Sequence, residues 1–359
     1  MSRIVVGMSG GVDSSVAASL LVEHGHDVVG VFMKNWDDMT SDPLYRKGMA
    51  TDCNWEKDAE DARSVCEKLG IPFHIYHLEK EYYDRVFKEF LHDIELGLTP
   101  NPDILCNQEM KFDVFLERAL RDEEADMIAT GHYARIQNAT LLRPKDLNKD
   151  QTYFLARMPR ESLRKTLFPL GELTKPEVRE IALKRGFQNA AKKDSTGICF
   201  IGNIDYRVFL KQYMQEAPGN IVDVNGKVLG THTGLFQYTL GQREGLGIGG
   251  TGPYYVVEKR EATKELVVSN NSEDELMYAT TCVVKDVYWL TDDEDVSQEY
   301  EVQVRYRQKA QRAILKKDEG NILVTFQNPQ RAVTPGQYAV WYRSEQLIGS
   351  GKIVSTGNA

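Results

Sequence analysis

The stretch that decides the fold is residues 5–21, VVGMSGGVDSSVAASLL, in which an apolar run meets two glycines and then a helical pattern. The apolar run predicts a β-strand, and apolar residues at three- and four-residue spacing over 14–23 predict a helix. A strand that ends in glycines and leads into a helix gathers backbone N–H groups and the positive end of the helix dipole at one point. This arrangement is typical of a loop that binds an anion such as a phosphate.

Around that stretch, the first half of the chain alternates apolar runs with helical patterns. Strands are predicted over 4–8, 28–33, 73–78 and 127–130, and helices over 14–23, 55–69, 81–96 and 109–120. Strands that alternate with helices predict a mostly parallel, doubly wound α/β sheet covered by helices. A further helix is predicted after Thr174, where T-K-P-E offers an N-cap threonine, a first-turn proline and Glu177, and Gly186 is expected to end it.

The character of the chain changes after about residue 205. A short helical segment over 206–216 leads to a glycine-rich, β-like section with a predicted hairpin turn at 224–227, V-N-G-K. From about residue 280 the sequence alternates with period two, so that Val302, Val304 and Tyr306 are expected to face one way, which predicts a small β-barrel or sandwich. We therefore expect an α/β domain over 1–204, a small glycine-rich α+β, mainly β, domain over 205–278 and a C-terminal β-barrel over 279–359.

Composition excludes several classes of protein. The chain has 359 residues, of which 42% are hydrophobic and 27% charged, as in a protein of two or three domains, and its net charge of -9 disfavours a surface coated by nucleic acid. No apolar window approaches the roughly 20 residues of a membrane span, and the apolar N-terminal run is too short for a secretory leader, so a cytoplasmic location is expected. The cysteines are odd in number and scattered, which argues against a disulfide scaffold and against a four-cysteine zinc site. They are Cys53, Cys66, Cys106, Cys199 and Cys282.

The glycine loop departs from the familiar ATP-binding pattern G-x-x-x-x-G-K-[ST], because no lysine follows Gly11. That omission favours another use of ATP, in which pyrophosphate leaves while the α-phosphorus is attacked. The run SGGVDSS at 9–15 resembles the SGGxDS motif of the PP-loop ATP pyrophosphatases, which adenylate a carbonyl or amide oxygen. The resemblance implies that Ser9, Ser14 and Ser15 supply hydroxyls and that Asp13 helps to place Mg²⁺ beside the phosphates. The alternative is a glycine turn that opens an ordinary Rossmann helix.

Two cysteines lie in distinctive settings. Cys106 follows T-P-N-P-D at 99–103, which is expected to form an exposed, stiffened loop before a helix that begins near Asn107. A thiol at a helix start has its thiolate favoured by the helix dipole, which predicts a lowered pKa and a raised reactivity. Cys199 lies in KKDSTGICFIG, between two lysines and an apolar turn, and taken alone it fits a core position as well as a catalytic one.

Three long motifs, in order, carry a resemblance to one family. GMSGGVDSS, NPDILCN and DSTGICFI resemble motifs of the tRNA-specific 2-thiouridylases, and GVFMKNW, ATGHYAR, KDQTYFL, TLGQREGLGIGG and VQVRYR extend the resemblance over essentially the whole chain. It implies an N-terminal PP-loop domain of the adenine nucleotide α hydrolase type, a small central domain and a tRNA-binding barrel. It also implies a sulfurtransferase that replaces the C2 oxygen of the wobble uridine (U34) by sulfur, through an O2-adenylated intermediate, with ATP converted to AMP and pyrophosphate.

The resemblance also implies roles for individual residues. Cys199 would carry a persulfide, Cys106 would be the partner thiolate, and Asp103 would be a general acid/base, with capping of the local turn as the alternative for Asp103. The implied ATP contacts are Gly7, Met8, Ser9, Gly10, Gly11, Val12, Asp13, Ser14, Met33 and Gly131. The implied tRNA contacts are Asn101, Pro102, Asp103, Lys149, Asp150, Gln151, Arg305 and Tyr306. A basic cluster is expected to add a phosphate track, made of Arg157, Arg160, Arg164, Lys165, Lys184, Arg185, Lys192 and Lys193.

The expected partners are tRNAs of the Lys, Glu and Gln type, bound by their anticodon arm, and an external persulfide donor, either a sulfur-relay protein or a cysteine desulfurase; a monomer is expected. Two sulfur routes stay open. Cys106 either frees hydrosulfide from the Cys199 persulfide or resolves the intermediate after the persulfide has attacked C2, and both routes end in a Cys106–Cys199 disulfide. Three rival hypotheses also stay open: a nitrogen-transferring PP-loop synthetase, a non-catalytic tRNA-binding or redox-sensing protein, and an iron–sulfur cluster in the sulfur step.

Overall fold

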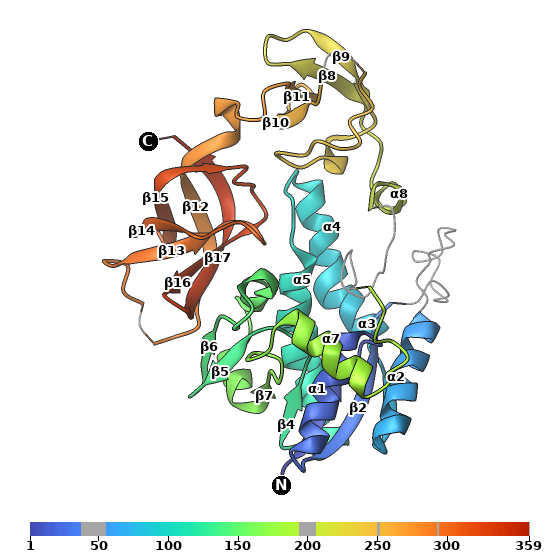
Figure 1. The fold of residues 1–359 in the computed structure, drawn as a ribbon. Helices are drawn as coiled ribbons and strands as arrows, with labels where there is room; N and C mark the ends of the chain where they lie inside the picture. The colour runs from blue at the N-terminus through green and yellow to red at the C-terminus, as the bar shows by residue number, and fades with distance from the viewer. Residues whose placement is uncertain (37–54, 194–205, 250–251, 293, 359) are drawn as a thin grey trace.

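The computed structural model describes residues 1–36, 55–193, 206–249, 252–292 and 294–358. Within these ranges the chain forms three sheets (Figure 1): a five-stranded sheet in the N-terminal half, a four-stranded sheet in the central section and an eight-stranded sheet made mostly of C-terminal strands. No helix in these ranges is long and apolar enough to cross a membrane.

The first half of the chain builds a parallel sheet in the order β3-β2-β1-β4-β7. Its strands are β1 (Arg3–Gly7), β2 (Asp27–Lys34), β3 (Phe73–His77), β4 (Met127–Ala129) and β7 (Thr166–Leu167). The predicted doubly wound class and its first four strands are confirmed, whereas β7 was missed because two residues form no period. The strand order reverses between β1 and β4, and the carboxyl ends of strands at such a switch point are where these folds bind ligands.

Helices cover both faces of this sheet (Figure 1). On one face, α1 (Val12–Glu23) and α2 (Trp55–Leu69) pack against β2, and α7 (Lys175–Lys184) packs against α1, in one hydrophobic cluster with Val28 and Phe32. On the other face, a second layer packs against Val29, Val31 and Met33. Alternate residues of one buried strand therefore face different helical layers. The second layer consists of α3 (Glu79–Tyr82), the π-helical η1 (Tyr83–Phe87), α4 (Lys88–Glu95), α5 (Pro102–Leu105), the π-helical η2 (Cys106–Val114) and α6 (Phe115–Asp122).

Local signals place α7 as predicted. Thr174 and Glu177 form a reciprocal capping box, in which the Thr174 backbone N–H donates to Glu177 Oε2 at 2.7 Å. At the other end, Gly186 has a φ of +63° and its N–H donates to the Leu183 carbonyl at 2.9 Å, so the glycine ends the helix in the left-handed conformation.

The central section is a small domain with a mixed four-stranded sheet in the order β10-β11-β8-β9. Its elements are α8 (Tyr206–Leu210), β8 (Gly219–Asp223), β9 (Val228–His232), β10 (Tyr255–Arg260) and β11 (Glu265–Ser269). The predicted hairpin turn at 224–227 is confirmed, because the Asp223 N–H donates to the Lys227 carbonyl at 2.9 Å and Gly226 has a φ of +83°.

The C-terminal section is a closed antiparallel barrel in the order β12-β15-β14-β13-β16-β17, with β12 pairing β17. Its strands are β12 (Tyr278–Trp289), β13 (Glu299–Gln303), β14 (Gln311–Asp318), β15 (Asn321–Arg331), β16 (Tyr338–Arg343) and β17 (Gln346–Gly357). The predicted barrel is confirmed. A hairpin of the α/β part, β5 (Arg135–Gln137) and β6 (Thr140–Leu142), extends the sheet beyond β17. The sequence contained no signal for this long-range pairing.

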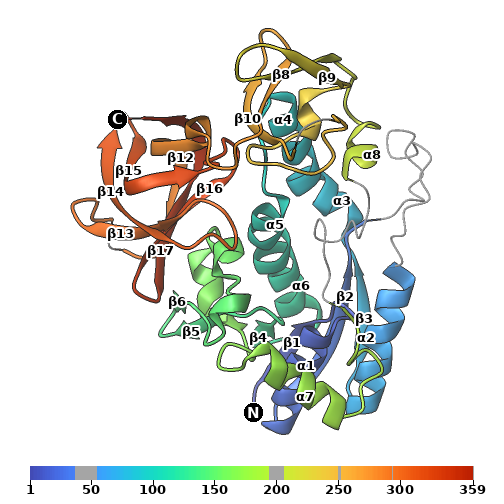
Figure 2. The ribbon, with the colours of Figure 1, turned by 45° about the horizontal axis from the view of Figure 1, so that its top comes forward.

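The three sections pack together around α4 and α5 (Figure 2). One hydrophobic cluster runs from Val31 of the parallel sheet to Tyr338 and Leu347 of the barrel. Lys352 of β17 pairs with Asp93 of α4 at 2.6 Å. The barrel is therefore anchored to the α/β part by a shared core and by a buried ion pair. Short 3₁₀ helices lie between these elements, at Leu147–Lys149, Thr152–Leu155, Arg160–Lys165, Leu235–Gln237 and Glu275–Met277.

Candidate active site

The loop after β1 turns at Gly10 into α1. Gly10 has a φ of +72°, and a Cβ there would lie 2.2 Å from the Asp58 carbonyl oxygen, so only glycine fits. Gly11 is the N-cap of α1 and has no side chain to accept hydrogen bonds from the first amides of the helix. A Cβ at Gly131, in the loop after β4, would lie 2.7 Å from the Ser14 nitrogen. The predicted loop over 7–14 and Gly131 thus lie together at the carboxyl edge of the sheet, around helix amides suited to an anion.

The hydroxyls of Ser14 and Ser15 are turned toward the protein, whereas Ser9 is exposed. Ser14 Oγ donates to the Gly11 carbonyl at 3.2 Å and lies 3.1 Å from the backbone nitrogen of Ser9, which donates to it. Ser15 is fully buried; its hydroxyl donates to the Gly11 carbonyl at 2.9 Å and accepts from Asn189. The expectation that Ser15 supplies a hydroxyl to a ligand is wrong, because that hydroxyl lies inside the protein.

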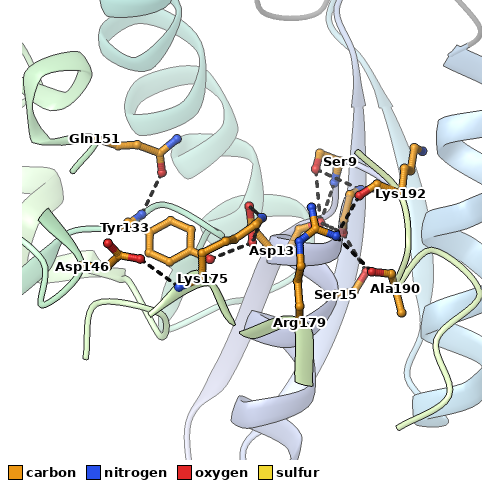
Figure 3. Close-up of polar contacts among 12 residues, drawn as sticks. Ser9, Asp13, Ser15, Tyr133, Asp146, Gln151, Lys175, Arg179, Ala190 and Lys192 are labelled. Carbon is orange, nitrogen blue, oxygen red and sulfur yellow. Dashed lines mark hydrogen bonds and ion pairs between the residues drawn. The ribbon is translucent and has the colours of Figure 1, made fainter. Parts of the chain in front are cut away.

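Asp13 is engaged by two side chains from distant elements (Figure 3). Lys175 Nζ lies 2.7 and 2.8 Å from its carboxylate oxygens, and the Tyr133 hydroxyl donates to Oδ1 at 2.9 Å. Within the described residues there is no cluster of three or more His, Cys, Asp or Glu side chains suited to a metal ion. Because Lys175 neutralises Asp13 in this arrangement, these residues do not form a preorganised Mg²⁺ site.

Two side chains from the segment after α7 reach the loop. Asn189 Nδ2 and Lys192 Nζ both donate to the Gly10 carbonyl, at 3.0 and 3.1 Å. Lys192 also binds Asp58 at 2.7 Å and Asp61 at 2.6 Å. Burial alone would lower the pKa of Lys192, but these two carboxylates outweigh it and raise the pKa. No local pattern in the sequence marks Asn189 or Lys175 as residues of a site.

Four of the eight residues of the expected basic track are paired with carboxylates. Arg160 pairs with Asp292, Lys184 with Glu180 and Arg185 with Glu23, and Lys192 is held by its two aspartates. The phosphate track itself stays a prediction.

Met33 lies between the loop and the second helical layer. It is 6% exposed, and its Cε would be 3.3 Å from a Cβ at Gly7, which would also meet the Phe115 ring at 3.5 Å. Met33 and Cys106 belong to the same hydrophobic cluster. The face of the sheet that carries Met33, a predicted ATP contact, is thus also the face that carries Cys106.

The predicted setting of Cys106 is wrong. The helix begins at Pro102, not near Asn107, because Asn101 is its N-cap and accepts a hydrogen bond from the Ile104 N–H at 3.3 Å. Proline is favoured in the first turn, where its missing N–H would have no partner in any case. Cys106 consequently starts the π-helical η2 and is fully buried, so it is neither in an exposed loop nor at the first turn. Asp103 lies in the first turn of α5, three residues before Cys106.

Cys53 and Cys199 lie outside the described residues. Cys66 and Cys282 are core residues, as expected by default, and burial raises the pKa of each thiol to about 12. His132 follows Gly131, and its Nδ1 lies 2.7 Å from Thr130 Oγ1. Burial beside Phe112 and Phe168, together with the nearby charge of Lys111, holds the pKa of His132 well below its usual value.

Two of the predicted tRNA contacts, Arg305 and Tyr306, line a cavity of about 580 Å³. Its lining includes Thr99, Arg305, Tyr306 and Gln337, with residues of the central domain. Asn101 Nδ2 donates to Gln337 Oε1 at 3.3 Å, and Gln337 Nε2 donates to the Thr99 carbonyl at 2.9 Å. Gln337, which the sequence left unassigned, therefore links the barrel to the segment before Cys106.

Two further predicted tRNA contacts, Asp150 and Gln151, are engaged in hydrogen bonds within the protein, in the segment just before Phe154. Phe154, three residues after Gln151, packs against Tyr306 with ring centroids 4.3 Å apart. Asp150 pairs with Arg143, and its Oδ1 also accepts from the Thr152 N–H at 2.9 Å. Gln151 Oε1 accepts from the Tyr133 N–H at 2.8 Å.

Family models match three successive parts of the chain. Their descriptions are a tRNA methyl transferase HUP domain over residues 2–203, a tRNA methyl transferase PRC-barrel domain over 207–270 and an aminomethyltransferase β-barrel domain over 279–353.

Similar full-length proteins share one name, tRNA-specific 2-thiouridylase. The chain is 48% identical over 357 residues to the MnmA 1 protein of Geobacillus kaustophilus. The alignment covers 97% of this chain and 94% of that protein. The chain is 46% identical to the MnmA protein of Lactiplantibacillus plantarum, over 99% and 96%, and 44% identical to that of Staphylococcus aureus, over 98% and 95%. Among solved structures, a 4-thiouridine synthetase–RNA complex with bound ATP aligns with a TM-score of 0.32 and 17% identity, over 59% of this chain and 50% of that one.

Proposed function

Since the chain belongs to the family of tRNA-specific 2-thiouridylases, we propose that it catalyses the ATP-dependent 2-thiolation of U34 in tRNA, with AMP and pyrophosphate as the other products. The observation that carries this proposal is that both predicted reaction sites lie on one face of the parallel sheet. The loop over 7–14 follows β1, which pairs with the strand that carries Met33, and Met33 and Cys106 belong to the core on the same face. A nucleotide bound at the loop and a uridine at the thiol would both lie on that side of the sheet.

The nucleotide-binding residues proposed are those of the loop, Gly7 to Ser14, with Met33 and Gly131. The open helix amides and the close approach of Gly131 support ATP at this point. ATP, when bound, supplies the adenylyl group that makes the C2 oxygen a good leaving group. Because Asp13 is paired with Lys175, we propose that Mg²⁺ binds together with the phosphates of ATP.

The sulfur chemistry is assigned to Cys199 as persulfide carrier, to Cys106 as its partner and to Asp103 as general acid/base. Burial of Cys106 supports a thiol shielded from water, where a persulfide would be cleaved without loss of sulfide to solvent. A carboxylate three residues before a helical cysteine lies on the neighbouring turn, within reach of the same substrate. The Cys106–Cys199 disulfide left after each turnover requires a reductant.

The tRNA contacts proposed are residues 101–103, Lys149, Asp150, Gln151, Arg305 and Tyr306. Their support is the cavity at which the segment before Cys106 meets the barrel. An enzyme that modifies a stacked base must extrude it, and aromatic and arginine side chains are suited to hold unstacked bases. We further propose a cytoplasmic monomer that works with an external persulfide donor, and domains bounded at residues 204 and 278.

The test is a single incubation of the full chain with ATP, Mg²⁺, a cysteine desulfurase with cysteine, and a tRNA that carries U34. Nucleoside mass analysis should show 2-thiouridine, and pyrophosphate should appear in step with it. Cys106→Ser and Cys199→Ser should each abolish the sulfur product, with Cys66→Ser as the control that keeps it.

Each rival has its own outcome in this assay. Thiolation that persists in both catalytic-cysteine variants, or without release of pyrophosphate, would refute the proposal. An iron–sulfur cluster would show as visible absorbance after anaerobic purification, which the Cys106→Ser variant would lose.

A further inference from the structure

The phosphate loop contains a peptide plane between two glycines, Gly10 and Gly11. Two adjacent glycines lack the Cβ atoms that restrict backbone rotation, so the plane between them can turn over more readily than any other in the loop. A trans peptide is planar, with its C=O and N–H on opposite sides. The plane therefore presents either an N–H donor or a carbonyl oxygen to the loop interior.

In the structure, the Gly10 carbonyl points away from the loop interior toward the segment after α7. It accepts from Asn189 Nδ2 at 3.0 Å and from Lys192 Nζ at 3.1 Å. The Gly11 N–H accordingly points to the opposite side, where Ser9 Oγ lies at 3.4 Å. On that side the first amides of α1 have no side-chain cap, so the Gly11 N–H, which donates to the exposed Ser9 hydroxyl, faces the same way as donors suited to an anion.

The two donors are themselves held in place. Arg179 of α7 donates to the carbonyls of Ala190 and Lys192, at 3.2 and 3.1 Å, and this fixes the backbone between Asn189 and Lys192 (Figure 3). The Lys192 ammonium is shared with Asp58 and Asp61 of α2, and Asn189 is 4% exposed. Because contacts with α7 and α2 fix Asn189 and Lys192, these two residues can hold the Gly10–Gly11 peptide in one orientation.

We propose that Asn189 and Lys192 are positioning residues that hold the Gly10–Gly11 peptide in the orientation that binds phosphate. The inference rests on the proposed function, since it takes the phosphates of ATP as the ligand. Without these donors the Gly10 carbonyl is free to turn into the loop, where its partial negative charge repels the phosphates. Neither residue touches the reacting atoms in this account, so the effect falls on ATP binding and not on the sulfur step.

The experiment is a titration of the full chain with Mg²⁺–ATP, for the parent and for Lys192→Met, Lys192→Arg and Asn189→Ser. Lys192→Met and Asn189→Ser should each raise the Kd for ATP at least about tenfold, the effect of a lost hydrogen bond with an ionic or buried partner. Lys192→Arg should recover much of the affinity. The KM for ATP should rise in parallel, with kcat at saturating ATP and the Kd for tRNA unchanged.

The control is Lys193→Met, which removes the same charge from an exposed neighbour. The inference is overturned if Lys192→Met and Asn189→Ser bind ATP as the parent does, or if Lys193→Met weakens ATP binding as much as they do. Asn189→Ser alone decides the matter if Lys192→Met does not fold. If the parent itself binds no ATP, the proposed function fails; if the parent binds ATP and thiolates tRNA while the variants match it, only this inference fails.

Discussion

The ion pair between Lys352 and Asp93 offers a sharp test of how the barrel is held to the α/β part. Lys352 Nζ lies 2.6 Å from Asp93 Oδ1, and the two side chains are 14% and 5% exposed. Replacing Lys352 by Met keeps most of the aliphatic packing and removes the cation. The Asp93 carboxylate is then buried without its partner.

The expected loss follows from that burial. Removing one member of a buried pair costs about 3–5 kcal/mol, because the remaining charge has neither water nor a counter-ion. Glu89, at 3.7 Å from Lys352, adds a second carboxylate to the same pocket and increases the repulsion. Since Lys352 keeps some contact with solvent, we expect the lower end of the range, a decrease of about 3 kcal/mol in the free energy of unfolding.

The assay is urea unfolding of Lys352→Met, of Asp93→Asn and of the double variant, so that the coupling between the two residues is measured directly. The matched control is Lys184→Met, since Lys184 lies at the same 2.6 Å from Glu180 but the two side chains are 73% and 62% exposed. That exposed pair should contribute less than about 0.5 kcal/mol. Two results would refute the reasoning: a loss for Lys352→Met no larger than for Lys184→Met, or a double variant less stable than Lys352→Met alone.

Three further predictions concern the cavity and the loop after β4. Gly336→Ala should destabilise the chain by about 1–3 kcal/mol in urea unfolding and raise the KM for tRNA, because Gly336 has a φ of +94° and a Cβ there would lie 2.7 Å from the Thr99 nitrogen. Tyr306→Ala should weaken tRNA binding in a filter assay by about 1–3 kcal/mol, with the Kd for ATP unchanged, since it removes one stacking surface. His132 has a folded pKa well below its unfolded value, so below about pH 6.5 the unfolded chain binds a proton that the folded chain does not. The free energy of unfolding therefore falls as the pH falls through this range, by up to about 1.4 kcal/mol per pH unit. His132→Gln should therefore reduce the decline in unfolding free energy between about pH 7 and pH 5.5; an unchanged slope would contradict the assignment.

The sequence predicted those parts of the fold that depend on neighbouring residues. The first four strands, the capping box at Thr174 and the hairpin turn at 224–227 form from contacts within a few residues, so local patterns identify them. The setting of Cys106 was misjudged for a local reason as well. The two prolines at 100 and 102 predict a loop, whereas Pro102 lies at the first position of a helix, which favours proline.

By itself, the sequence determined that a glycine loop opens a helix after the first strand and that this loop suits an anion, because both follow from the backbone preferences of adjacent residues. Only the tertiary structure decided what holds that loop. Asn189 and Lys192 lie 179 and 182 positions from Gly10, and Lys175 lies 162 positions from Asp13. No periodicity spans such separations, since these contacts exist only when the packing of α7 and α2 on the sheet brings the side chains to the loop.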